Sequence, residues 1–417
     1  ELEEKFKRKL KEATSDCDSI AFDLSFQGLI ANEMMKKAAE WGKKVSDDEF
    51  SKCIMKQSDI KKIVKIKEKT DVINYIYEKI KSKRNYSRNE IINIMMCISQ
   101  GFLTIFAGEP GVGKTSICNI IADSIGLINN GVSDRYVEVS VEKGWTSKRD
   151  FIGYYNPLTK EFDKSNNLLF KSFNILDNEY KNGINDVPFY ILLDEANLSP
   201  MEHYWADFMN VCDLNKDNRS ISLGDGYAYN IPDTLRFLAT INYDHTTENL
   251  SPRLIDRAWI IILDNNIIDI IHECKNIKEE NSVILFEDIK NVFSYDSAKL
   301  NNSLDRIDTV LYQIYNLFRE NNISISPRIQ EMINQYLSVG YDLFEKTEIT
   351  AKEFVALDYA ISQKLLPKID GYGEDYRKFL NNLEEIFDDN NMMKSKGITK
   401  RILDKGDKNM EYYQFFL

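Results

Sequence analysis

Apolar residues follow different spacings in different parts of the chain, and the changes divide it into three regions. Residues 1–90 place apolar side chains at helical spacing, as at Ile73 and Ile76, among many lysines and glutamates. Residues 91–264 contain short β-type apolar runs separated by helical or looped stretches. From residue 265 to 417 the spacing is helical almost to the end. We therefore predict a helical N-terminal region, an α/β core, and a helical lid with a C-terminal extension.

Five apolar runs in the middle region predict the strands of one sheet. These runs are Phe102–Ala107, Tyr136–Val141, Phe189–Leu193, Leu235–Ile241 and Trp259–Leu263. Because each run is almost continuously apolar and helical or looped stretches separate them, they favour parallel strands with helices on both faces. The clearest helical periods of the lid region are Asp305–Arg319, Arg328–Leu337 and Lys352–Leu366. The predicted fold class is α/β, with a parallel five-stranded sheet followed by a helical lid.

The net charge, the cysteines and the lengths of the apolar runs limit which partners and sites the chain can have. The 54 lysines and arginines against 66 aspartates and glutamates give a net charge of −12, which excludes an overall basic nucleic-acid coat but leaves room for a basic groove. The six cysteines are scattered without a C-x-x-C pair, so neither a zinc site nor a disulfide framework is predicted. No apolar run approaches the roughly 18 residues that span a bilayer. We expect a cytoplasmic protein without a membrane partner.

A glycine-rich loop follows the first predicted strand and precedes the helical stretch Ser116–Ile125. Residues 108–115, GEPGVGKT, fit the pattern G-x-x-x-x-G-K-[ST] in full. Glycines let main-chain N–H groups surround phosphates, and the helix N-terminus favours their charge. We expect Lys114 to reach the β- and γ-phosphate oxygens and Thr115 to be a Mg²⁺ ligand. The predicted nucleotide-binding residues are Gly108, Glu109, Pro110, Gly111, Val112, Gly113, Lys114, Thr115 and Ser116.

The run Phe189–Leu193 ends in two carboxylates, Asp194 and Glu195, as a Walker B element does. We expect Asp194 to hold Mg²⁺ through its water shell. Glu195 is expected to polarise the water that attacks the γ-phosphate. Because a protein that only binds a nucleotide needs no base there, Glu195 favours a hydrolase.

Polar residues farther along the chain, at the end of the next predicted strand, before the last strand and in the lid, complete the candidate site. Asn242 ends the next strand and is expected to orient the lytic water and sense the γ-phosphate, while Asp244 either assists or caps a turn. Arg257, and after it Arg253, are candidates to reach the nucleotide of a neighbouring subunit, although Arg253 also fits a surface ion pair. A serine and a proline precede Arg328, which places it in the first turn of a lid helix, where a nucleotide phosphate would offset its charge.

The order of these elements resembles the AAA+ ATPases, in particular the clade with a hairpin inserted in helix 2 and another before sensor 1. Residues 145–165 resemble the first insert, and residues 219–232 resemble the second hairpin. Within this clade, three stretches resemble McrB-type motor subunits of modification-dependent restriction systems. They are Trp145–Pro157, Asp194–Leu198 with the following His203-Tyr204 and Asp207-Phe208, and Phe354–Lys368. The resemblance covers about residues 90–417.

This resemblance implies a ring, usually a hexamer, whose nucleotide hydrolysis drives DNA translocation and activates a separately encoded McrC-type nuclease in restriction or antiphage defence. The three dispersed histidines form no nuclease centre in the chain itself. The founding McrB proteins hydrolyse GTP and carry Asn-x-x-Asp after sensor 1, whereas here Asp244 comes one place early after Asn242. This departure removes the support for GTP specificity. The glycine-rich loop contacts phosphates and does not read the base, so ATP is favoured only because it is the usual substrate of AAA+ ATPases, with GTP as the alternative.

Two other functions are compatible with the same motifs. One is a MoxR-like chaperone that remodels proteins, since that group shares the inserted hairpins. The other is a nucleotide-gated assembly scaffold whose hydrolysis is incidental. The complete set of Glu195, Asn242 and two arginines argues against the scaffold.

Overall fold

The structure is a computed structural model of the 417-residue chain. It describes Glu4 and residues 63–128, 135–156, 161–163, 167–212, 219–224, 227–243, 248–263, 282–295 and 305–416. The chain divides into two compact units, residues 1–54 with 155–163, and residues 55–154 with 164–417. Apart from Glu4, the predicted helices before residue 63 lie outside the described residues.

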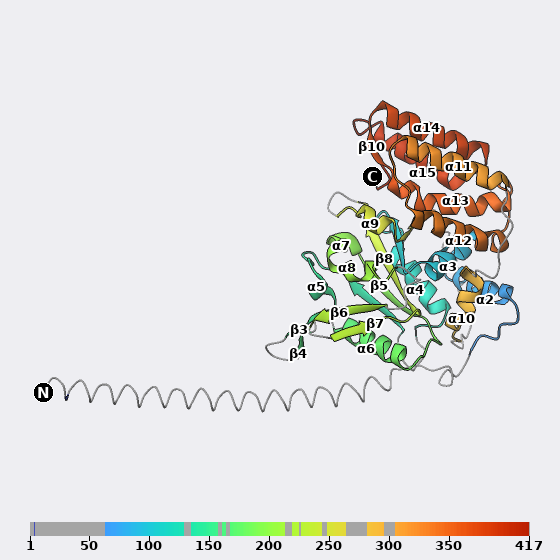
Figure 1. Ribbon diagram of the computed structural model, residues 1–417. Helices are drawn as coiled ribbons and strands as arrows, with labels where there is room; N and C mark the ends of the chain where they lie inside the picture. The colour runs from blue at the N-terminus through green and yellow to red at the C-terminus, as the bar shows by residue number, and fades with distance from the viewer. Residues whose placement is uncertain are drawn as a thin grey trace. The chain divides into compact units, whose positions relative to one another are not determined.

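A parallel sheet of five strands lies at the centre of the larger unit (Figure 1). Its strands are β1 (Leu103–Gly108), β2 (Tyr136–Ser140), β5 (Phe189–Asp194), β8 (Leu235–Asn242) and β9 (Trp259–Ile262). Their order across the sheet is β2-β5-β8-β1-β9, and every neighbouring pair is parallel. All five predicted strands are confirmed to within one residue at each end. Strand β1 is buried along its whole length, as expected for a strand covered on both faces.

The register brings the carboxyl ends of neighbouring strands to one edge of the sheet. Gly108 at the end of β1 lies opposite Asn242 at the end of β8. Asp194 at the end of β5 lies opposite Ser140 at the end of β2. Ligands of open parallel sheets bind outside this edge. The glycine-rich loop and the polar strand ends therefore meet where such a ligand binds.

Helices cover the sheet, and the first helical turn of one of them follows the glycine-rich loop. The longer ones are α2 (Lys69–Lys81), α3 (Arg88–Gln100), α4 (Lys114–Ser124), α6 (Asn167–Lys181) and α10 (Phe286–Phe293). Helix α2 packs against α4 and α10, although its sequence lies in the region predicted as N-terminal and separate from the core. Helix α3 begins with a capping box, in which Ser87 and Glu90 bond to each other's main-chain N–H. These contacts join residues 69–100 to the loop-bearing helix.

Shorter elements make up the rest of the core, including the two stretches predicted as inserts, residues 145–165 and 219–232. They are α5 (Lys148–Phe151), β3 (Tyr154–Asn156), β4 (Glu161–Asp163), the 3₁₀ turn Ala196–Leu198, α7 (Met201–Tyr204), α8 (Ala206–Met209), β6 (Ser220–Gly224), β7 (Tyr227–Asn230) and α9 (Pro252–Ile255). Strands β6 and β7 pair as an antiparallel hairpin, and β3 pairs with β4. Helices α5 and α8 meet in an aromatic cluster, with the rings of Phe151 and Phe208 5.8 Å apart. Both rings are fully buried.

Five helices of the described residues form the lid (Figure 1, orange to red). They are α11 (Asp305–Glu320), α12 (Pro327–Leu343), α13 (Lys352–Lys364), α14 (Glu374–Asp389) and α15 (Met393–Gly406). The three predicted lid helices are all present. A short antiparallel pair, β10 (Asp370–Tyr372) and β11 (Tyr412–Gln414), was not predicted, because three-residue strands have no readable period. No helix in the described part of the chain is long and apolar enough to cross a bilayer.

Buried polar side chains attach the lid to helix α3. The Tyr336 hydroxyl of α12 and the Gln363 amide of α13 both donate to Asn93 Oδ1, at 2.5 and 2.7 Å. The Cys97 thiol donates to Gln363 Oε1 at 2.8 Å. All four side chains are buried. Because buried polar groups are costly when unpaired, this network favours one docking position of the lid.

Candidate functional site

Two glycines and a lysine define the loop between β1 and α4. Gly111 and Gly113 have φ angles of 86° and 87°, in the left-handed region that favours glycine. The side chain of Lys114 is buried, and its ammonium donates to the carbonyls of Gly108 at 2.9 Å and Glu109 at 2.8 Å. The loop therefore keeps a cation beside the N-terminus of α4, where main-chain N–H groups also favour an anion.

One carboxylate oxygen joins this loop to two strands of the sheet. Asp194 Oδ1 accepts hydrogen bonds from the hydroxyls of Thr115 and Thr240, each at 2.7 Å. Thr240 Oγ1 in turn accepts the main-chain N–H of Glu195 at 2.9 Å. The structure thus brings Thr115, Asp194 and Glu195 together. Sequence reasoning missed Thr240, because a threonine within a buried β-strand is ordinary.

Thr115 and Asp194 are suited to Mg²⁺. Both offer oxygen atoms, and the two oxygens already lie in hydrogen-bond contact. Mg²⁺ prefers oxygen ligands, keeps several waters, and is often held by one or two carboxylates together with substrate phosphates. Asp194 is only partly buried, which leaves room for water or phosphate. The residues present therefore fit the predicted metal.

Glu195 has an unusual backbone conformation directly after β5. Its φ of 53° and ψ of 45° lie in the left-handed region, where a residue with a side chain pays roughly 1–3 kcal/mol. Such residues cluster at functional sites. The side chain of Glu195 is exposed, whereas the following Ala196 is buried. The strained turn therefore presents this carboxylate to solvent at the sheet edge.

Asn197 connects the turn after β5 to the end of β8. Its amide donates to the carbonyls of Asn242 at 3.0 Å and Glu248 at 3.3 Å, and its Oδ1 accepts the Asn242 N–H at 3.3 Å. The Asn197 side chain is buried, and that of Asn242 is partly buried. Asn197 thus fixes the main chain that carries Asn242, a role that its sequence did not reveal. Asp244 lies outside the described residues.

The three predicted arginines lie on other elements. Arg257 donates from Nε to the Met209 carbonyl at 3.0 Å and from Nη1 to the Arg253 carbonyl at 3.1 Å. Arg253 is exposed on α9, whereas Arg257 is partly buried. Arg328 lies in the first turn of α12, where its sequence placed it. Two donors of Arg257 thus bond within its own chain, while Arg253 faces solvent.

A buried lysine of the lid contacts the segment that carries Arg257. Lys364 is fully buried, and its ammonium donates to the carbonyls of Ala258 at 2.6 Å and Asp256 at 3.2 Å. Burial lowers the pKa of Lys364 to about 7, and the nearby Asp256 offsets only part of this shift. Lys368 also pairs with the Asp256 carboxylate at 2.6 Å. Lys364, at the end of α13, therefore bonds to both residues that flank Arg257 in the sequence.

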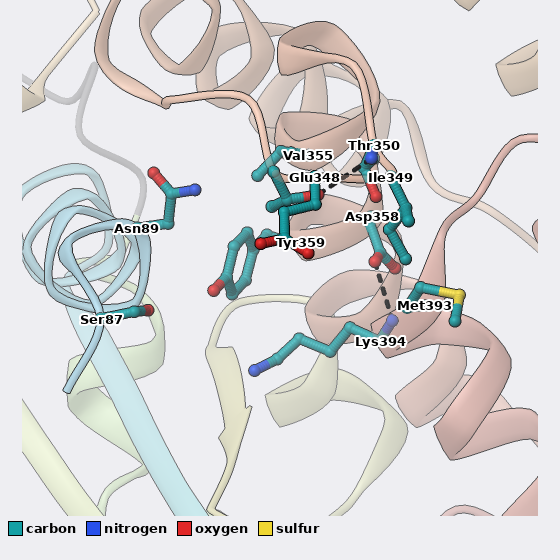
Figure 2. A pocket seen from close by; sticks show the side chains of 11 residues that line it. Ser87, Asn89, Glu348, Ile349, Thr350, Val355, Asp358, Tyr359, Met393 and Lys394 are labelled. Atoms are coloured by element: carbon teal, nitrogen blue, oxygen red, sulfur yellow. Dashed lines mark hydrogen bonds between the residues drawn. The ribbon is translucent and has the colours of Figure 1, made fainter. Parts of the chain in front are cut away.

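A cavity of about 520 Å³ lies where α3, α13, α15 and the loop 347–350 meet (Figure 2). Its buried carboxylate, Asp358, accepts the N–H groups of Lys394 at 2.8 Å and Ser395 at 2.7 Å. Burial raises the pKa of Asp358, and these hydrogen bonds oppose the shift. The Lys394 ammonium lies 4.9 Å from the centre of the Tyr359 ring. None of the predicted site residues lines this cavity, and its carboxylate already caps α15.

Comparison with known proteins assigns no function to this chain. A family described as "Domain of unknown function (DUF8727)" matches residues 279–415, which include the lid but not the glycine-rich loop. No curated protein matches the chain. Among solved structures, it is similar to a protein from Cytophaga hutchinsonii described as a "putative ATPase". That similarity has 17% identity and a TM-score of 0.44, and covers 65% of this chain and 80% of that one.

Proposed function

We propose that this chain is a Mg²⁺-dependent nucleoside triphosphatase of the AAA+ type, with ATP favoured as the substrate and GTP as the alternative. The observation that carries the proposal is the set of hydrogen bonds around Asp194. They join Thr115 of the phosphate-binding loop to Thr240, and Thr240 to the strained main chain of Glu195. A loop for phosphates, a pair of metal ligands and an exposed carboxylate thus occupy one edge of the sheet.

Each residue then has a defined task. The loop N–H groups and Lys114 bind the β- and γ-phosphates, and Thr115 and Asp194 hold the metal. When bound, Mg²⁺ neutralises charge on the phosphate oxygens. Glu195 accepts a proton from the attacking water. Asn242, supported by Asn197, orients that water.

Equilibrium binding and turnover of three variants separate these tasks. Lys114→Ala is expected to abolish binding of ATP, because it removes the loop cation. Glu195→Gln is expected to bind ATP as tightly as the wild type while turning it over at least about 100-fold more slowly. The affinity of Asp194→Asn for ATP is expected to be the same with and without Mg²⁺. Normal ATP binding by Lys114→Ala would refute the proposed site.

We further propose that the subunits form a ring, usually hexameric, that translocates DNA and activates a McrC-type nuclease in restriction or antiphage defence. The support is the sequence resemblance of the first insert, the Walker B region and part of the lid to McrB-type motors. The proposal predicts that duplex DNA stimulates hydrolysis, and comparing ATP with GTP identifies the substrate. Stimulation by a protein client instead of DNA would favour a MoxR-like chaperone. Normal biological function of Glu195→Gln would favour the scaffold.

A further inference from the structure

The loop between α2 and α3 carries two consecutive cations beside helix α4. Its path is fixed at the end of α2, where the N–H groups of Lys83 and Arg84 both donate to the Ile80 carbonyl, at 2.9 and 2.8 Å. At its other end the capping box of α3 begins at Ser87. Main-chain hydrogen bonds on both sides therefore determine where the two side chains project from.

The two cations have different partners. Lys83 forms an ion pair with Asp123 near the end of α4. Arg84 instead reaches the beginning of that helix, where its Nη1 donates to the Gly113 carbonyl at 3.3 Å. A β-carbon on Gly113 would overlap the Arg84 guanidinium. The guanidinium thus packs directly against the last glycine of the phosphate-binding loop.

Arg84 has no carboxylate partner among the described residues. Its one side-chain hydrogen bond in the described structure goes to the Gly113 carbonyl, and its charge also lowers the pKa of the nearby Tyr86, which burial raises more strongly. Arg84 is partly buried, and Lys114 adds a second cation on the same loop. Two cations beside one helix N-terminus form a strong site for an anion, since the helix dipole adds to their charge.

We propose that Arg84 is a nucleotide-binding residue, which contacts the phosphates from within the same subunit alongside Lys114. The inference rests on the proposed nucleotide site. A guanidinium presents several donors in a planar fork and can bond two phosphate oxygens at once. On binding, Arg84 exchanges a neutral carbonyl acceptor for a charged phosphate. Gly113 is required beside it, both for its φ of 87° and for the space its missing β-carbon leaves.

The test is the dissociation constant of ATP and of ADP with Mg²⁺, measured calorimetrically in the Glu195→Gln background so that no hydrolysis occurs. Arg84→Ala and Arg84→Gln are expected to bind both nucleotides about 10- to 100-fold more weakly, as the loss of a charged hydrogen bond predicts. Arg84→Lys should recover part of the loss. Lys83→Ala is the matched control, since it removes the neighbouring charge, and its affinity should stay within about twofold of the reference.

The thermal unfolding temperature, measured without nucleotide, shows whether a variant binds more weakly only because its fold is less stable. Arg84→Gln retains a hydrogen-bond donor and should unfold at the temperature of the parent, so a weaker affinity in this variant supports a direct contact. Affinities of both Arg84→Ala and Arg84→Gln within twofold of the parent would overturn the inference, provided that Lys114→Ala fails to bind. If the parent itself binds no nucleotide, the proposed function fails together with the inference.

Discussion

At Thr240 a single hydroxyl donates to Asp194 and accepts the N–H of Glu195. The donated bond orients the carboxylate, and the accepted bond holds the left-handed turn that presents Glu195. In the proposed site Asp194 is a metal ligand, and the removal of a residue that orients such a ligand without touching the metal typically changes activity 10- to 100-fold. Thr240 is therefore a positioning residue for both carboxylates.

Thr240→Val is expected to reduce kcat about 10- to 100-fold, with a change in the dissociation constant of ATP of less than about threefold. Steady-state phosphate release and calorimetry measure the two quantities. The control is Thr104→Val on the neighbouring strand β1, because the Thr104 hydroxyl is buried without a hydrogen-bond partner in the described structure. Thr104→Val should have the same kcat as the wild type. Equal losses of kcat in both variants would show that Thr240 acts only through general packing.

The sequence predicted the residues of this cluster that lie in continuous motifs. Lys114 and Thr115 belong to one eight-residue pattern, and Asp194 and Glu195 end one apolar run. Thr240 and Asn197 were missed because their contacts depend on how β5 and β8 align and on the turn after β5. Arg84 was missed because the path of the α2–α3 loop brings it to Gly113 from 29 residues away.

At the scale of elements, the contact between α13 and the segment after α9 places a buried ammonium against two carbonyls. Charge burial of this kind opposes folding unless the group loses its proton. The folded pKa of Lys364, about 7, lies below the value of 10.5 of a free lysine. Between these two values the unfolded chain binds more protons than the folded chain, so the free energy of unfolding rises with pH.

Lys364→Met removes this titration, and the test is the difference in unfolding free energy between wild type and variant. Urea unfolding at pH 6, 7, 8 and 9 should show a nearly constant difference below about pH 7. Above that pH the wild type should gain stability relative to the variant. Lys378→Met, which removes a largely exposed lysine of α14, is the control and should show no such trend. A pH-independent difference for Lys364→Met would mean that Lys364 keeps its normal pKa.

The spacing of apolar residues predicted the long strands and helices. Strands β1 and β5 are almost wholly apolar because both faces are covered, and α11 and α12 show clear helical periods. The pair β10 and β11 joins segments about 40 residues apart, and its pairing depends on contacts that no local pattern contains. Docking of the lid through Asn93 and Gln363 was likewise unpredictable, because the polar residues that bond lie 270 positions apart.

Across the whole molecule, the lid and the last residues of the chain contact two segments of the core that carry predicted site residues. Lys364 and Lys368 hold the segment of Arg257, and the ring of Phe416 at the end of the chain lies 5.8 Å from that of Tyr243, next to Asn242. A change in lid position would therefore reach both the arginine segment and the end of β8. In the proposed ring, this would connect the nucleotide state of one subunit to the arginines offered to its neighbour.

Mixing two inactive variants tests whether the arginines act between subunits. Arg257→Ala is expected to lose about 10³-fold in kcat, the loss typical of an arginine that stabilises phosphoryl transfer, and Arg253→Ala is the parallel variant. Mixed with Glu195→Gln, either variant should recover activity above the sum of the two alone, because some sites then receive both intact residues. The mixture is measured by phosphate release at a fixed total protein concentration. Activity equal to that sum would place the arginine's role within its own subunit.

Steady-state phosphate release shows whether the cluster around Asp194 hydrolyses a nucleoside triphosphate. The wild type is compared with Glu195→Gln and Lys114→Ala, with ATP or GTP, in Mg²⁺ and in EDTA. We expect Mg²⁺-dependent turnover of at least one nucleotide by the wild type, and the loss of this turnover in both variants. Equal turnover by wild type and Glu195→Gln, or no turnover by the wild type with either nucleotide, would show that this cluster does not hydrolyse nucleotides as proposed.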